Sequence, residues 1–220
     1  MKTFFNKNLM SNYQDFNWSP SEAYSTNYIL PKLMELLDKK KNKCILDLGC
    51  GNGLMTKAIL DMGYDIYGID ASETGINIAA KSHPNRFFLQ DISDNNLPVE
   101  IIDKKFDTII STEVIEHIYN PYQYLAFCSK IFENNQYEGQ LILSTPYHGY
   151  LKNLALAVSG KMDFHYHPLS VGGHIKFWSK NTIGKLLNEC GYEIKNFQGA
   201  GRFPYFWKSM IIVGALNKKY

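Results

Sequence analysis

The sequence has no excess of either charge, no long apolar run and no secretory leader, and each absence excludes a class of protein. Its 23 lysines and arginines nearly balance 21 aspartates and glutamates, which leaves a net charge of +2 over 220 residues. That balance gives no electrostatic case for a nucleic-acid partner. No apolar run approaches the roughly 18 residues of a membrane-spanning helix, and the N-terminus lacks the apolar core of a signal peptide. We therefore expect a cytoplasmic protein without an integral membrane segment.

Cysteine is also scarce, and its spacing excludes a zinc or disulfide framework. The four cysteines form no C-x-x-C pair and stand at Cys44, Cys50, Cys128 and Cys190. We expect them to behave as small apolar residues in a reducing compartment.

Strand-like and helix-like segments alternate along the chain. Short apolar segments predict strands at 44–49, 65–70, 86–91, 106–112 and 140–146, followed later by 192–197 and 206–216. Helical spacing occurs at 54–63, 72–82, 121–132 and 181–191. No repeat or linker divides the chain, so we predict one α/β domain spanning 1–220. Its sheet should be mostly parallel, with helices on both faces and ligands at the carboxyl ends of the strands.

Three alternating glycines follow the first predicted strand in the stretch CILDLGCGNG. Gly49, Gly51 and Gly53 differ from the G-x-G-x-x-G of dinucleotide sites, because the third glycine comes one residue early. Asp47 precedes them by two residues, where it would repel a pyrophosphate but suit a cationic amine or sulfonium. We expect a ligand to approach this backbone closely.

Two further acids end the next two predicted strands. Asp70 stands where a carboxylate can accept hydrogen bonds from both ribose hydroxyls. Asp91, followed by Ile92, stands where it can hold an adenine amino group and ring face. Together with Asp47 these acids predict a nucleoside ligand with a positive end and no phosphates. The alternative is that Asp47 and Asp91 only cap turns.

These motifs resemble those of class I S-adenosylmethionine-dependent methyltransferases, from about residue 40 to the end. ILDLGCGNG, YGIDAS and FLQDI match the family's motifs, and STEVIEHIYNP (111–121) resembles the E-V-x-E-H segment of the ubiquinone-pathway O-methyltransferases. The resemblance implies a Rossmann-like, seven-stranded sheet whose last strand runs antiparallel. It also implies an N-terminal helical cap within residues 1–40, which 19–39 fits as a helix broken or bent at Pro31.

The resemblance further implies the cofactor and its binding residues. The cofactor would be S-adenosyl-L-methionine, and its pocket would be lined by Asp47, Gly49, Cys50, Gly51, Gly53, Asp70, Ala71, Asp91, Ile92, Thr112 and Glu113. The expected reaction transfers a methyl group to a small-molecule acceptor, with a hydroxyl oxygen as the expected nucleophile. Methylation of a small amine and a non-catalytic cofactor-binding protein are the alternatives. A nucleic-acid amino-methyltransferase is disfavoured, because STEVIEH stands where such enzymes carry an Asp/Asn-Pro-Pro-aromatic motif.

His117 is the predicted catalytic base, since a hydroxyl acceptor must lose its proton. It stands four residues after Glu113, so the two side chains would share one face if this loop were helical. The alternative is that His117 only hydrogen-bonds a neighbouring loop. The resembled family can also use a divalent metal, and Glu113, Glu116 and His117 are then the candidate ligands, although we expect no metal.

Residues 146–179 are too long for a plain connection and predict a substrate lid. They are rich in aromatic residues and histidines, and Gly172 and Gly173 offer a hinge. His165 and His167 would share one side of an extended segment, but an aromatic lid is favoured over a metal site there. If the acceptor were a lipid quinone, the apolar segment 150–160 could make a peripheral membrane contact. The predicted acceptor-binding residues are Tyr24 and Tyr28 from the cap and Tyr147, His148 and His174 from the lid.

Overall fold

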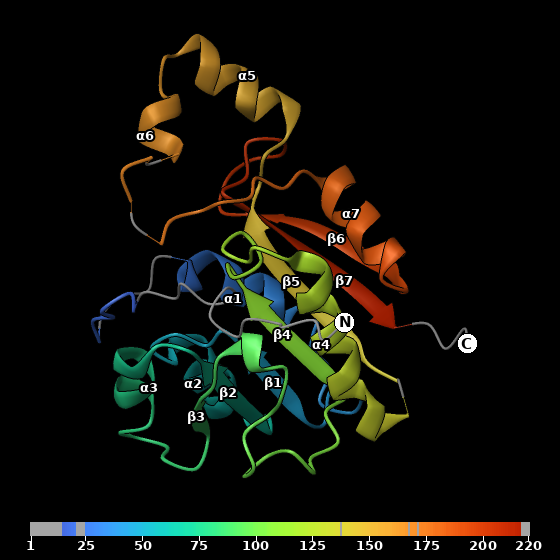
Figure 1. The fold of residues 1–220 in the computed structure, drawn as a ribbon. Helices are drawn as coiled ribbons and strands as arrows, with labels where there is room; N and C mark the ends of the chain where they lie inside the picture. Colours follow the sequence, from blue (N-terminus) through green and yellow to red (C-terminus); the bar gives the residue numbers. More distant parts are fainter. Residues whose placement is uncertain (1–14, 21–24, 137, 167, 171, 217–220) are drawn as a thin grey trace, which may run out of the picture.

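Seven strands form a single sheet in the order β3-β2-β1-β4-β5-β7-β6 (Figure 1). The structure is a computed structural model that describes residues 15–20, 25–136, 138–166, 168–170 and 172–216. β7 pairs antiparallel with both β5 and β6, whereas the pairs among β1 to β5 are parallel. The predicted fold class is confirmed. The strands are β1 (Ile45–Leu48), β2 (Ile66–Asp70), β3 (Phe87–Leu89), β4 (Thr108–Thr112), β5 (Gln140–Pro146), β6 (Tyr192–Ala200) and β7 (Ser209–Leu216).

The central parallel strands are apolar throughout because helices cover both faces of the sheet. Every residue of β1 is buried, as are all but the last of β2 and β4. The register pairs Asp47 with Gly68 and Ile110, so the carboxyl ends of β1, β2 and β4 meet at one edge. The acids that end these strands are therefore brought together.

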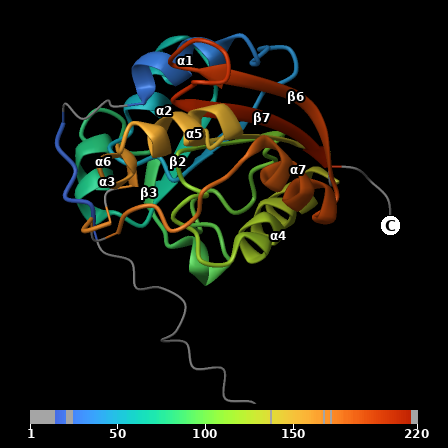
Figure 2. The same ribbon diagram turned by 90° about the horizontal axis from the view of Figure 1, so that it is seen from above.

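Helices cover both faces of the sheet (Figure 2), and a layer of apolar side chains on each face packs them against it. One layer joins α1 (Thr26–Met34) and α2 (Leu54–Asp61) to residues such as Ile45 and Ile211. The other joins α4 (Pro121–Ile131) and α7 (Lys180–Glu189) to residues such as Leu46 and Ile212. α3 (Glu73–Ala79) packs beside β2 and β3. Two short 3-10 helices lie in the connections, η2 (Ile92–Asp94) between β3 and β4 and η3 (Phe132–Asn135) between α4 and β5.

The N-terminal cap differs from the predicted helix over 19–39. The helix is α1 alone, and it runs through Pro31 without a break. Burial of Ile29 and Leu33 against the sheet compensates for the hydrogen bond that proline cannot donate. Residues 15–20, which we call the strap, are not helical and lie across the glycine loop and the start of α3.

The insertion after β5 projects from the body of the molecule (Figure 1). It contains α5 (Tyr150–Val158) and α6 (Met162–Tyr166), after which the chain returns without regular structure to α7. The extended segment predicted around His165 is wrong, since this residue lies in α6, and His167 lies outside the described residues. No described helix is both long and apolar enough to cross a membrane.

Candidate active site

All three motif glycines adopt left-handed backbone angles, which explains why glycine is needed there. Gly49, Gly51 and Gly53 have φ values of +85°, +54° and +76°. A Cβ on Gly49 would lie 2.4 Å from Val114, and one on Gly51 would lie 2.6 Å from Trp18. Side chains of Val114 and Trp18 therefore pack directly against Gly49 and Gly51 and leave no room for a Cβ there.

Asp47 and Asp70 lie near the carboxyl ends of β1 and β2. Asp47 is only 1% exposed; its Oδ2 accepts a hydrogen bond from Thr56 at 2.6 Å, and its Oδ1 has no partner among the described residues. Burial raises the pKa of Asp47 to about 7. The carboxylate of Asp70 accepts from the Gly51 and Ser72 N–H groups, both at 2.7 Å. Burial raises the pKa of Asp70 as well, against the effect of these two bonds.

The third acid shows the geometry of a turn cap. Asp91 Oδ1 accepts from the Ser93 N–H at 2.8 Å and caps η2, which begins at Ile92. Ala71 follows Asp70 and Thr112 ends β4, so both stand at the same edge of the sheet. Cys50 is buried in the glycine loop against Gly68. The structure brings these residues together and leaves their ligand contacts as predictions.

The loop after β4 is a turn, so the predicted helical face shared by Glu113 and His117 is wrong. Glu113 has a left-handed φ of +56°, and residues 115–117 form a turn. The Glu113 carboxylate accepts from Ser144 Oγ at 2.7 Å and Ser209 Oγ at 3.0 Å, across β5 and β7. Burial raises its pKa to about 7. Ser144 and Ser209 thus fix the Glu113 carboxylate, which does not belong to the cluster around His117, and no sequence motif indicates either serine.

Glu116, His117 and His174 form the cluster that the turn produces. Their potential ligand atoms all lie within 4.8 Å of one another. The Glu116 side chain is 1% exposed, and among the described residues no hydrogen bond of normal geometry reaches either oxygen. Burial and the charge of Glu113 raise the pKa of Glu116 well above its usual value, which the nearby Thr145 hydroxyl and the Glu116 backbone only partly offset. His174 Nε2 lies 3.9 Å from Glu116 Oε1, and its ring meets that of His117 edge-on at 4.9 Å. The set that could hold a metal is therefore not Glu113, Glu116 and His117, because His174 takes the place of Glu113.

Hydrogen bonding fixes the tautomer of His117. Its Nδ1 lies 3.0 Å from the Gly172 carbonyl and 3.3 Å from that of Gly173, and carbonyl oxygens only accept. Nδ1 must therefore carry the proton, which leaves Nε2 as an acceptor in the neutral ring. Burial lowers the pKa of His117 below its ordinary value. The residue does bind a neighbouring loop, and that contact orients its free nitrogen.

The strap lies within the predicted N-terminal cap, but its residues were not among the predicted site residues. Asp15 accepts hydrogen bonds from the N–H of Thr74 at 3.1 Å and the hydroxyl of Ser72 at 2.8 Å, at the start of α3. Trp18 packs on Gly51, and Phe16 meets His117 edge-on at 5.5 Å. The strap thus covers the glycine loop through Trp18 and contacts His117 through Phe16, although it lies far from both in the sequence.

The predicted acceptor-binding residues fall into separate groups. The Tyr28 hydroxyl lies 3.3 Å from Ser209 Oγ, and His174 belongs to the His117 cluster. Tyr147 instead packs edge-on against Trp207, with 5.1 Å between ring centroids. His148 packs against the insertion residues His165, Tyr166 and Phe177. Tyr24 lies outside the described residues.

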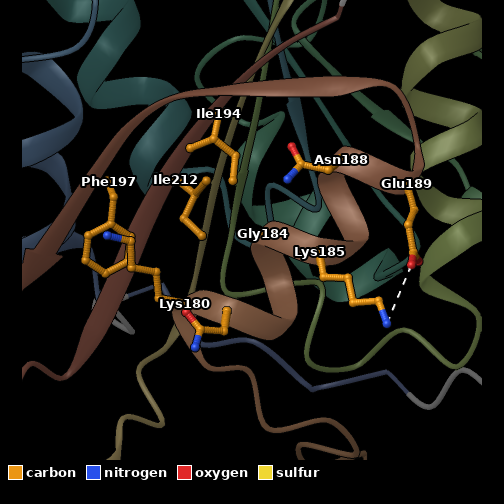
Figure 3. Close-up of a pocket in the computed structure, with 9 residues that line it drawn as sticks. Lys180, Gly184, Lys185, Asn188, Glu189, Ile194, Phe197 and Ile212 are labelled. Carbon is orange, nitrogen blue, oxygen red and sulfur yellow. Dashed lines mark ion pairs between the residues drawn. The ribbon is translucent and has the colours of Figure 1, made fainter.

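A groove between α7 and β6 lies apart from these residues (Figure 3). It is lined by α7 residues such as Lys185 and Glu189 and by Ile194, Phe197 and Ile212. None of the predicted site residues lines it, and it contributes nothing to the site.

Comparison with known proteins identifies a family and several relatives of this chain. A family model described as "Methyltransferase domain" matches residues 22–196. The chain belongs to this methyltransferase family. A ubiquinone biosynthesis O-methyltransferase of Cereibacter sphaeroides is 25% identical over 180 residues, covering 80% of this chain and 70% of the relative. One from Coxiella burnetii is 24% identical over 194 residues, covering 85% and 81%.

Solved methyltransferases share the fold. An S-adenosylmethionine-dependent methyltransferase from Aquifex aeolicus matches with a TM-score of 0.63 and 14% identity, over 91% of this chain and 100% of that one. Magnesium protoporphyrin IX methyltransferase from Synechocystis PCC 6803, solved with bound S-adenosylhomocysteine, matches with a TM-score of 0.60 and 21% identity, over 86% and 82%. The predicted family, fold and enzyme class, an S-adenosylmethionine-dependent methyltransferase, are confirmed.

Proposed function

We propose that this methyltransferase transfers the methyl group of S-adenosylmethionine to a hydroxyl oxygen of a small molecule. The observation that carries the proposal is the state of His117: a neutral ring whose Nδ1 is committed to Gly172 and Gly173 and whose Nε2 can accept a proton. A hydroxyl nucleophile needs such a base, whereas a neutral amine does not. The O-methyltransferase relatives support the same choice of acceptor atom.

The residues present fit the cofactor. Asp47 Oδ1 is a buried acceptor that no described residue satisfies, suited to a cationic end. Each oxygen of Asp70 accepts one backbone bond and keeps a second lone pair for a ribose hydroxyl. When bound, S-adenosylmethionine supplies a methyl group already activated on a sulfonium. Asp47 and Asp70 would hold the cationic end and the ribose.

The rest of the chain would align the acceptor and remove its proton. His117 would accept the hydroxyl proton at Nε2 while Gly172 and Gly173 hold its ring in place. The strap and the insertion would exclude water, which favours displacement at the methyl carbon. Phe16 and His174 supply surface beside this base.

A divalent metal is a second way to activate the acceptor, and one observation favours it. Among the described residues, no hydrogen bond of normal geometry reaches the buried Glu116 carboxylate, and its Oε1 lies 3.9 Å from His174 Nε2, an arrangement suited to binding a cation. Glu116, His117 and His174 would hold the ion, which would supply a Lewis acid to a bound hydroxyl. His117 would then be a ligand rather than the base.

A methyl-acceptor screen with a chelator arm tests the proposal. Purified protein is incubated with radiolabelled S-adenosylmethionine and a matched panel of phenols, sugars and amines, with and without EDTA. We expect label on an oxygen acceptor. Transfer confined to amines would contradict the choice of oxygen, and cofactor binding without any transfer would support the non-catalytic alternative. Loss of transfer with EDTA, restored by Mg²⁺ or Zn²⁺, would replace the histidine base with the metal.

A further inference from the structure

Three cations gather where the insertion joins the body of the molecule. Lys152 comes from α5, and Arg202 and Lys208 come from the connection between β6 and β7. Lys152 Nζ lies 3.4 Å from the Lys208 carbonyl, and Gly201, beside Arg202, packs against the Lys208 side chain. The Arg202 guanidinium is near enough to lower the pKa of Lys152, which burial already depresses, to about 8. Two separate segments thus place like charges side by side.

Lys152 is poorly satisfied for a buried ammonium. It is 6% exposed and is the one buried residue of α5. Of its three N–H donors, one reaches the Lys208 carbonyl, and that oxygen already accepts the Tyr147 N–H at 3.1 Å. Among the described residues, neither Lys152, Arg202 nor Lys208 forms an ion pair. Burying an unpaired charge is costly, so a partner of opposite charge would be bound favourably.

The cations adjoin the acceptor side of the site. Ser209, next to Lys208, donates to Glu113 Oε2 at 3.0 Å and lies 3.3 Å from the Tyr28 hydroxyl. The Lys208 ammonium lies over the Tyr28 ring, 5.1 Å from its centroid. The charge of Glu113 acts on Lys152, but Ser144 and Ser209 already donate hydrogen bonds to this carboxylate. It attracts Lys152 through space without pairing with it.

We propose that Lys152, assisted by Arg202 and Lys208, binds an anionic group of the methyl acceptor, a carboxylate or a phosphate. The inference deepens the proposed function and depends on it. An oxyanion between these side chains would accept the free N–H groups of Lys152 in charge-assisted hydrogen bonds. Because Lys152 belongs to the insertion, the same contact would seat α5 on a bound acceptor.

Calorimetry with matched anionic and neutral probes tests this assignment. Protein saturated with S-adenosylhomocysteine is titrated with 3,4-dihydroxybenzoate against catechol, glucuronate against glucose, and glucose 6-phosphate against glucose. We expect at least one anionic probe to bind about tenfold or more tighter than its neutral partner, as loss or gain of one charged contact implies. The carboxylate and phosphate arms distinguish the two sources of charge.

Variants separate recognition from folding. Lys152→Met should abolish the preference for the anionic probe. Arg202→Gln, a change at an exposed position, should reduce that preference. Lys161→Met, on the same insertion, is the control and should preserve it. Equal binding within every probe pair overturns the proposal, as does an unchanged preference in both Lys152→Met and Arg202→Gln. Affinity for S-adenosylhomocysteine is measured first, because its absence contradicts the proposed function, whereas cofactor binding without anion preference contradicts this inference alone.

Discussion

At the scale of single residues, Asp70 joins the glycine loop to the start of α3 and is also the predicted ribose ligand. Its carboxylate accepts from Gly51 and Ser72. Asp70→Asn keeps the shape but turns one acceptor into a donor that faces a ribose hydroxyl or a backbone N–H. We expect affinity for S-adenosylhomocysteine to fall about tenfold to a hundredfold, by calorimetry, at 1.4 kcal/mol per tenfold. Asp61→Asn, an exposed change in α2, is the control; equal affinity in both variants would contradict the assignment.

His117 is the residue on which the proposed mechanism depends. As the base, it contributes about 10²–10⁴-fold, so His117→Ala should lower kcat by that factor while cofactor affinity stays within about threefold. Burial lowers the His117 pKa, and the protonated ring cannot accept a proton. The wild-type rate should therefore rise with pH through an ionisation below the ordinary histidine value of 6.5 and be level near pH 7. Near-wild-type turnover in folded His117→Ala would place the base elsewhere, with His174 as the next candidate.

At the scale of elements, α1 carries an exposed proline in its interior. The helix continues through Pro31, but this residue lacks the N–H that would bond the Asn27 carbonyl. Pro31→Ala restores that bond and a residue of high helix propensity. We expect the free energy of unfolding to rise by about 1–3 kcal/mol in urea titrations. Lys32→Ala, which removes only an exposed ion pair with Glu35, should change it by less than about 0.5 kcal/mol. Lower stability in Pro31→Ala would mean that the helix does not persist through this residue.

The elements also show where sequence reasoning succeeds and where it stops. Buried parallel strands are apolar throughout, so β1, β2 and β4 could be located from composition, and with them the positions of Asp47 and Asp70. The turn at Glu113 could not. Glu113 has a left-handed backbone, and its carboxylate accepts hydrogen bonds from serines of two other strands. Helical spacing considers only residues three or four apart, so it cannot predict these long-range bonds.

At the scale of the whole molecule, the strap and the insertion reach the same site although they lie far apart in the sequence. Phe16 of the strap packs against His117 and lies near Gly172, and the N–H groups of Ile175 and Lys176 both donate to the Glu116 carbonyl at 3.0 Å. Both segments therefore contact the turn that contains Glu116 and His117. Closure over a bound cofactor should involve the two together.

Hydrogen exchange tests that coupling, and Asp15 offers a way to break it. Although burial acts to raise its pKa, hydrogen bonds from Thr74, Asn17 and Ser72 prevail and lower it from 3.8 to about 2. A depressed carboxyl pKa stabilises the folded form above the pKa of the unfolded chain. The strap should therefore stay bound to the start of α3 above about pH 4 and loosen as the pH falls toward 2.

At neutral pH, we expect S-adenosylhomocysteine to slow hydrogen exchange in 15–20 and 172–176 together. Asp15→Asn should restore fast exchange in the strap and weaken protection of 172–176, whereas Asp163→Asn on α6 should change neither. Protection of one segment without the other would show that strap and insertion close independently, and equal exchange with and without ligand would show that neither is a lid.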